Sequence, residues 1–149
     1  MKLKLPPPVV AIFAVLAMQA LLRLFPGNWQ WSGRLYVVVA LMLVATIVGA
    51  PAVLQFLRAK TTVHPRYPER ATTLVTGGIF RVSRNPMYLG LVCVLIAVAL
   101  LTRQPLNLII VAIFVVYMTL FQIKPEEQAL EAKFGDSYRD YCSRVRRWI

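Results

Sequence analysis

Four long apolar runs are the feature that most restricts how this chain can fold. They cover residues 9–25, 35–57, 86–102 and 106–123. Each run approaches the roughly 20 helical residues that cross a hydrocarbon core of about 30 Å. Because 58% of all residues are hydrophobic and only 15% are charged, a soluble domain of this size could not bury the apolar surface. We therefore predict an all-α, polytopic membrane protein: a single membrane domain over residues 1–149 with four transmembrane helices.

The basic residues are distributed unevenly between the two sides of the predicted membrane. The N-terminus, the loop 58–85 and the segment 124–149 carry 14 of the 17 Lys and Arg residues, whereas Arg23, Arg34 and Arg103 lie on the other side. Cytoplasmic loops collect Lys and Arg. We therefore expect an integral protein of a bacterial inner membrane, or an equivalent membrane, with both termini in the cytoplasm. This orientation and anionic lipid headgroups account for the net charge of +11, so no nucleic-acid partner is expected.

Several other functional classes find little support in the residue types. The four runs contain no Asp, Glu, Lys or His, so a transporter or channel is a weak alternative. The single histidine, His64, has no nucleophile beside it with which to build a hydrolytic triad. Cys93 and Cys142 lack metal-ligand spacing, and no metal is expected. Polar chemistry is thus confined to the two predicted cytoplasmic segments.

The predicted cytoplasmic loop 58–85 is longer than structureless connections usually are, so we expect function in it. Gly77 and Gly78 either let backbone N–H groups approach a ligand or simply form a turn. Asn85 and Pro86 have a structural interpretation too, as the N-cap and first turn of the third membrane helix. Taken singly, none of these motifs decides the function.

The segment 124–149 is predicted to be an amphipathic, cytoplasmic helical segment. Its apolar residues recur at helical spacing: Leu130, Phe134, Tyr138, Tyr141, Val145 and Trp148. This stripe is expected to lie on the bilayer or against the bundle, with Gly135 splitting the helix in two. Glu126 and Glu127 either stabilise the first helical turn or perform polar chemistry. Arg144 is predicted to face inward and hold an anionic group.

The order of these motifs is more specific than any one of them. The sequence reads Leu-Val-Thr-Gly-Gly-Ile-Phe-Arg over 74–81, Arg-Asn-Pro-Met-Tyr-Leu-Gly over 84–90, then a helical hairpin, paired glutamates and a Phe-Gly-x-x-Tyr-x-x-Tyr-x-x-Arg motif over 134–144. Over about residues 61–149, this order resembles the isoprenylcysteine carboxyl methyltransferase and phospholipid methyltransferase superfamily. The resemblance implies an integral membrane methyltransferase that uses S-adenosylmethionine and releases S-adenosylhomocysteine. Its implied acceptor is lipid-like or hydrophobic.

The residues predicted to contact the cofactor are His64, Gly77, Gly78, Arg84, Asn85, Pro86, Tyr88, Glu126 and Glu127. Catalytic roles are predicted for Glu127, through polar contact with the cofactor, and for Arg144, which would orient the acceptor. The isoprenylcysteine enzymes usually have His where this chain has Asn85, and commonly have Gly-Pro-Tyr where it has Gly-Ile-Phe over 78–80.

The acceptor therefore stays open among a lipidic thioether carboxylate, a phospholipid amine and a small hydrophobic thiol. An amine acceptor would need a base, for which Glu126 and His64 are the candidates. The alternative function is a non-catalytic membrane module that keeps the fold for binding or assembly. Binding of the cofactor separates the two interpretations.

Overall fold

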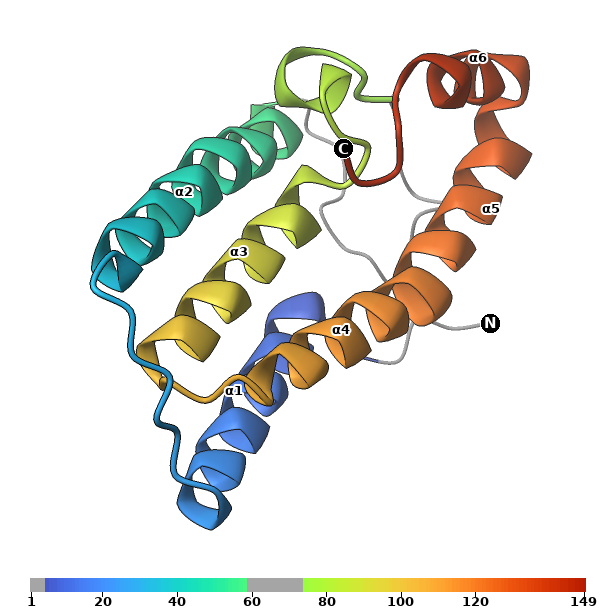
Figure 1. The fold of residues 1–149 in the computed structure, drawn as a ribbon. Coiled ribbons are helices and arrows are strands. Elements are labelled where there is room, and N and C mark those ends of the chain that lie inside the picture. The colour runs from blue at the N-terminus through green and yellow to red at the C-terminus, as the bar shows by residue number, and fades with distance from the viewer. Residues whose placement is uncertain (1–4, 59–73) are drawn as a thin grey trace.

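The structure, a computed structural model, describes residues 5–58 and 74–149, and these residues are helical wherever they form regular structure. The elements run in the order α1 (Pro7–Leu24), α2 (Arg34–Arg58), the 3-10 turn η2 (Gly78–Arg81), α3 (Pro86–Leu101), α4 (Asn107–Met118), the π-helical turn η3 (Thr119–Ile123), α5 (Lys124–Phe134) and α6 (Asp136–Arg144) (Figure 1). The predicted all-α class is confirmed.

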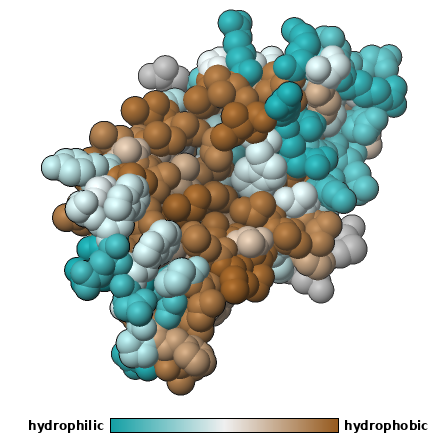
Figure 2. Space-filling view, viewed as in Figure 1, coloured by the Kyte–Doolittle hydropathy of each residue, from teal (hydrophilic) through white to brown (hydrophobic). Residues whose placement is uncertain are grey.

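Three helical stretches are long and apolar enough to cross a membrane. They are Pro7–Leu24, Arg34–Gln55 and Asn107–Phe134, whereas the apolar helix α3 is shorter, at 16 residues. Large hydrophobic side chains on α1 and α2 are exposed, including Ile12 at 60% and Ile47 at 65%. In Figure 2, hydrophobic surface covers most of the visible face, and hydrophilic residues gather at two opposite ends. These features indicate an integral membrane protein in contact with bilayer lipids.

The third long stretch extends beyond the boundary that the sequence predicts. The sequence predicts a span ending at residue 123 and a new helix beginning at Pro125, but one helical rod continues to Phe134 (Figure 1). Proline lacks the N–H that a regular helix would use. Here Pro125 lies at the start of α5, directly after the wider π turn Thr119–Ile123, which accommodates the missing bond. The predicted break at Gly135 is confirmed, since α5 ends before it and α6 begins after it.

Helix α3 lies at the centre of the bundle, with α2 on one side and α1 and α4 on the other (Figure 1). Small residues let α2 and α3 approach closely. A Cβ added to Gly90 would lie 3.3 Å from the carbonyl oxygen of Ala45 and 3.6 Å from the Cα of Gly49. Close approach of this kind is how membrane helices gain packing without a hydrophobic driving force between them.

A second hydrophobic cluster joins the segment before α3 to α6. Its buried members are Ala52, Phe80, Tyr138, Tyr141 and Val145, with Leu130 and Phe134 packed against them. Most of the apolar stripe predicted in 124–149 therefore packs against protein. The Tyr141 hydroxyl donates a buried hydrogen bond of 2.7 Å to the Phe80 carbonyl oxygen. This contact fixes α6 over the turn η2, next to the start of α3.

Candidate functional site

The residues just before α3 are hydrogen-bonded to residues that follow α6. Asn85 occupies the N-cap position of α3 but makes no side-chain capping bond. Instead, its Nδ2 donates to the carbonyl oxygen of Arg147 at 2.9 Å. The backbone N–H of Arg84 donates to the carbonyl oxygen of Arg146 at 3.1 Å. The amide of Asn85 thus joins two distant parts of the chain, in a role that capping statistics would not reveal.

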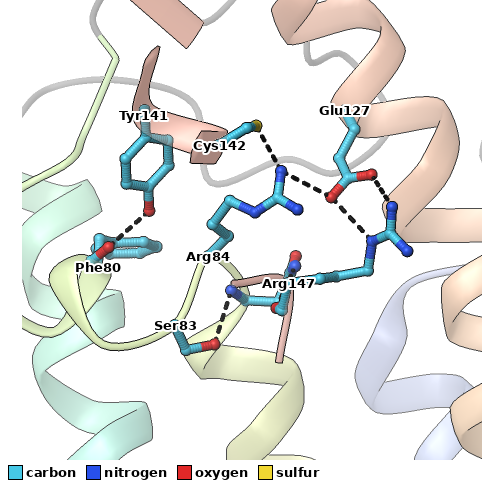
Figure 3. A network of polar contacts seen from close by, with 8 residues as sticks. Phe80, Ser83, Arg84, Glu127, Tyr141, Cys142 and Arg147 are labelled. Atoms are coloured by element: carbon cyan, nitrogen blue, oxygen red, sulfur yellow. Dashed lines mark hydrogen bonds and ion pairs between the residues drawn. The ribbon is translucent and has the colours of Figure 1, made fainter. Parts of the chain in front are cut away.

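Two arginines converge on the carboxylate of Glu127, as Figure 3 shows. Arg84 Nη1 lies 3.2 Å from Oε1. Arg147 binds as a fork, with its Nε donating to Oε1 at 3.0 Å and its Nη2 donating to Oε2 at 2.7 Å. The hydrogen bonds to Glu127 raise the pKa of Arg147 above its ordinary value, so this guanidinium remains charged. We call these three side chains the ion-pair cluster.

The ion-pair cluster is partly shielded from solvent and has capacity for further polar contacts. The side chains of Arg84 and Glu127 are only 13% and 16% exposed. Arg84 Nη1 also donates to the Cys142 sulfur. Its Nε–H is buried and has no partner among the described residues. Since two guanidinium groups face one carboxylate, the cluster has a net positive charge and a free donor, which favour an anionic ligand group.

The neighbouring carboxylate, Glu126, has different surroundings. Its Oε2 accepts a hydrogen bond of 3.0 Å from the hydroxyl of Tyr88. Within residues 5–58 and 74–149, no Lys or Arg forms an ion pair with Glu126, whereas Glu127 has two. The paired glutamates are therefore unequal: one is neutralised by arginines, and the other retains capacity for a cation or a proton.

An apolar cavity of about 810 Å³ lies between the start of α1, α2 and α3. Its lining comprises Pro6, Pro7, Pro8, Met42, Ala45, Thr46, Gly49, Ala50, Val53, Met87, Tyr88, Gly90, Leu91 and Val94. Nearly all of these side chains are apolar, so the cavity suits a hydrocarbon group rather than a charged one. Tyr88 belongs to both environments, because it lines the cavity and its hydroxyl donates a hydrogen bond to Glu126.

The two predicted glycines occupy different backbone conformations. Gly78 has φ +56°, in the left-handed region that favours glycine, and a Cβ there would overlap the Gln55 side-chain amide. Gly77 has φ −90°, and no atom of the described residues lies within 4 Å of where its Cβ would be. Gly78 therefore has a local structural requirement for glycine, whereas Gly77 leaves space beside the turn.

Two predicted site residues do not join this arrangement. Arg144 is exposed on α6 and pairs with Asp140 at 2.6 Å, so the inward orientation expected for it is not the one that the structure has. The reason is local: α6 ends at Arg144, and the helix presents this side chain to solvent beside the residue one turn earlier. The catalytic role of Arg144 stays a prediction. His64 lies outside the described residues.

The structure also assigns contacts to residues that the sequence did not distinguish. Arg147 was one of several basic residues in a basic segment, and Cys142 had no expected partner. The extended backbone of Val145, with φ −126°, redirects the chain after α6, and helical spacing cannot anticipate that change. Among the described residues, no group of three or more His, Cys, Asp or Glu could hold a metal ion.

Comparisons with known proteins agree with the motif order. The family model described as phospholipid methyltransferase matches residues 33–137, which include α2, α3, α4 and α5. An uncharacterised protein of Haemophilus influenzae is 46% identical over 63 residues, which is 42% of this chain and 100% of that relative. No solved structure matches the chain. The matched residues cover well over half of the sequence, and the chain therefore belongs to the phospholipid methyltransferase family.

Proposed function

We propose that the protein is an integral membrane methyltransferase that transfers a methyl group from S-adenosylmethionine to a lipid-like or hydrophobic acceptor. Members of the family are S-adenosylmethionine-dependent methyltransferases. One observation carries the proposal for this chain. Tyr88 lines the apolar cavity and also hydrogen-bonds to Glu126, the sequence neighbour of Glu127 in the ion-pair cluster. A polar site and a hydrocarbon site thus adjoin at one residue.

The polar residues fit the groups that this cofactor presents. The buried Nε–H of Arg84 has no described partner, and it is a suitable donor for the cofactor's carboxylate. The carboxylates of Glu126 and Glu127 are suitable acceptors for its ammonium group and ribose hydroxyls. Among the described residues, the space beside Gly77 is open, which permits the backbone to approach a ligand closely. Arg84, Gly77 and the paired glutamates are therefore the proposed cofactor contacts.

The cavity supports a hydrophobic acceptor. Its position beside exposed membrane helices would let a hydrocarbon chain remain in an apolar environment while its polar end meets Tyr88 and Glu126. Bound S-adenosylmethionine supplies an electrophilic methyl group. The chain's own contribution is to hold the acceptor in line with that group and to exclude water. For an amine acceptor, Glu126 would accept the proton as the nitrogen–carbon bond forms and the sulfur–methyl bond breaks.

The membrane arrangement completes the proposal. We propose that α3 is a fourth crossing despite its length, because its 16 residues rise about 24 Å and polar residues at either end extend the span. The bias of basic residues towards one side supports cytoplasmic termini. The ion-pair cluster would then lie at the cytoplasmic end of α3 and beside the first turn of α5, where a water-soluble cofactor can reach it.

The first test is isothermal titration of detergent-purified protein with S-adenosylmethionine and S-adenosylhomocysteine. Glu127→Gln should weaken binding by about 10- to 100-fold, because hydrogen bonds to charged groups contribute about 1.5–3 kcal/mol. Arg84→Ala should also weaken it. The matched control is Glu131→Gln, one turn further along α5, whose exposed carboxylate pairs with Arg139. That control should bind as the unaltered protein does.

Binding that depends on Glu127 and Arg84 would justify a methyl-transfer screen with radiolabelled cofactor across lipid extracts. Absence of binding by folded protein, in detergent and again in nanodiscs, would refute the proposal. That result would favour the non-catalytic membrane module. Loss of binding in Glu131→Gln as well would show that the variants act through the stability of α5 rather than through the site.

A further inference from the structure

The residues after α6 form a strap across the candidate site. We define the strap as residues 145–149. Its backbone carbonyl groups accept hydrogen bonds from the Arg84 N–H and the Asn85 amide at 3.1 and 2.9 Å. Trp148 packs against the main hydrophobic core, which includes Tyr88. Three separate kinds of contact therefore hold the strap against the beginning of α3.

The strap brings Arg147 to the carboxylate of Glu127. The two hydrogen bonds from Arg147, at 3.0 and 2.7 Å, use both carboxylate oxygens. A fork of this kind fixes the plane of the carboxylate as well as its position, which a single point charge cannot do. Arg84 contacts only Oε1. Without Arg147, the Oε2 atom of Glu127 would have no partner among the described contacts.

The bound carboxylate still has capacity for a ligand. An ionised carboxylate has about four acceptor positions. Glu127 accepts two hydrogen bonds from Arg147, and its Oε1 also forms an ion pair with Arg84 Nη1 at 3.2 Å. Oε2 accepts a single hydrogen bond among the described residues, which leaves a position for a donor from the cofactor. Arg147 thus orients Glu127 without using all of its capacity.

We infer that Arg147 is a positioning residue of the site: it acts through Glu127, holding that carboxylate in the orientation that receives the cofactor's hydrogen-bond donors. The inference rests on the proposed function. It also assigns a site role to the strap, which lies beyond the residues 33–137 that match the family model.

A double-mutant cycle on S-adenosylhomocysteine affinity tests this inference. The variants are Arg147→Gln, Glu127→Gln and the double variant. A thermal melt of a separate sample first shows that each variant is folded, and the variant is then titrated in detergent. Each single variant should weaken binding by about tenfold or more. Because Arg147 acts through Glu127, the double variant should bind no more weakly than Glu127→Gln alone. Arg139→Gln, an exposed arginine paired with Glu131 and Asp136, removes the same charge and should bind normally.

Arg147→Lys provides a second variant should Arg147→Gln fail to fold. It retains the positive charge and loses the fork, so affinity should fall by about three- to tenfold. Normal binding in either Arg147 variant would overturn the inference, as would losses that multiply in the double variant. These results differ from failure of the proposed function, in which the unaltered protein itself would not bind S-adenosylmethionine or S-adenosylhomocysteine.

Discussion

The adjacent glycines at the start of the turn η2, the N-cap Gly77 and the first residue Gly78, should respond very differently to the same substitution. Gly78 has φ +56°, and an added Cβ would lie 1.8 Å from Nε2 of Gln55. Gly77 has φ −90°, and a Cβ there would have no neighbour within 4 Å in the part of the chain that the structure describes. Gly78→Ala should therefore destabilise the protein, whereas Gly77→Ala should leave the free energy of unfolding unchanged within about 0.5 kcal/mol.

The loss expected for Gly78→Ala has two parts. The left-handed backbone costs an L-residue about 1–2 kcal/mol. The Gln55 side chain must also swing away from the new methyl group, since real Cβ atoms do not approach within 3.0 Å of a heavy atom. Adding Gln55→Ala removes the second part and leaves the first. The double variant should accordingly recover stability only to within about 1–2 kcal/mol of the unaltered protein.

Thermal and denaturant unfolding in one detergent would measure the free energy of unfolding of Gly77→Ala, Gly78→Ala and the double variant. The single variant Gln55→Ala is the reference for the double variant. Equal effects of Gly77→Ala and Gly78→Ala would refute the reasoning, because the structure distinguishes the two positions by both angle and space. Failure of Gln55→Ala to rescue any stability would refute the steric part alone. If Gly77→Ala unfolds normally but loses S-adenosylhomocysteine affinity, the space beside Gly77 belongs to the ligand site.

Two further predictions concern packing and pH. Gly90→Val should cost about 1–3 kcal/mol of unfolding free energy by separating α2 from α3, since even a Cβ would lie 3.3 Å from the Ala45 carbonyl oxygen. Gly49→Ala is the control and should not lower the unfolding free energy, because no described atom lies within 4 Å of the added Cβ. Burial raises the pKa of Tyr141 to about 12, so the folded state favours the neutral phenol. The stability that this group contributes is therefore fully present below pH 10 and is lost as the pH rises towards 12. Tyr141→Phe should lower the free energy of unfolding by about 1 kcal/mol at neutral pH, because the hydrogen bond to the Phe80 carbonyl oxygen is lost. The stability of this variant should then decline less steeply with pH over that alkaline range than the stability of the unaltered protein. An identical alkaline decline in both proteins would contradict this assignment.

Much of the architecture follows from hydrophobic length and composition. The apolar runs predict the helices because lipid requires backbone hydrogen bonds to be made within each spanning segment. The boundary after residue 123 was harder to predict, because the π turn Thr119–Ile123 lets the helix continue past Pro125. Such a turn also changes which face later residues occupy. Helical spacing from the membrane span therefore cannot orient Glu126 and Glu127.

The candidate site could be predicted where a motif identifies its residues and not where the backbone changes direction. Arg84 and Glu127 are 43 positions apart, and the resemblance named both; the structure joins them at 3.2 Å. Arg144 was predicted to face inward because it lies close to Tyr138 and Tyr141 in the sequence. The helix ends there, and the extended Val145 turns the chain so that Arg147 reaches Glu127 instead. Sequence periodicity carries no information beyond the end of a helix.

The strap has a consequence for biosynthesis. Because the ion-pair cluster combines residues 84, 127 and 147, it cannot form while only the first membrane helices have been translated and inserted. Every apolar helix leaves the ribosome before Arg147 does, so an early insertion intermediate lacks the finished site. Chain order thus delays assembly of the site until the membrane helices have been synthesised.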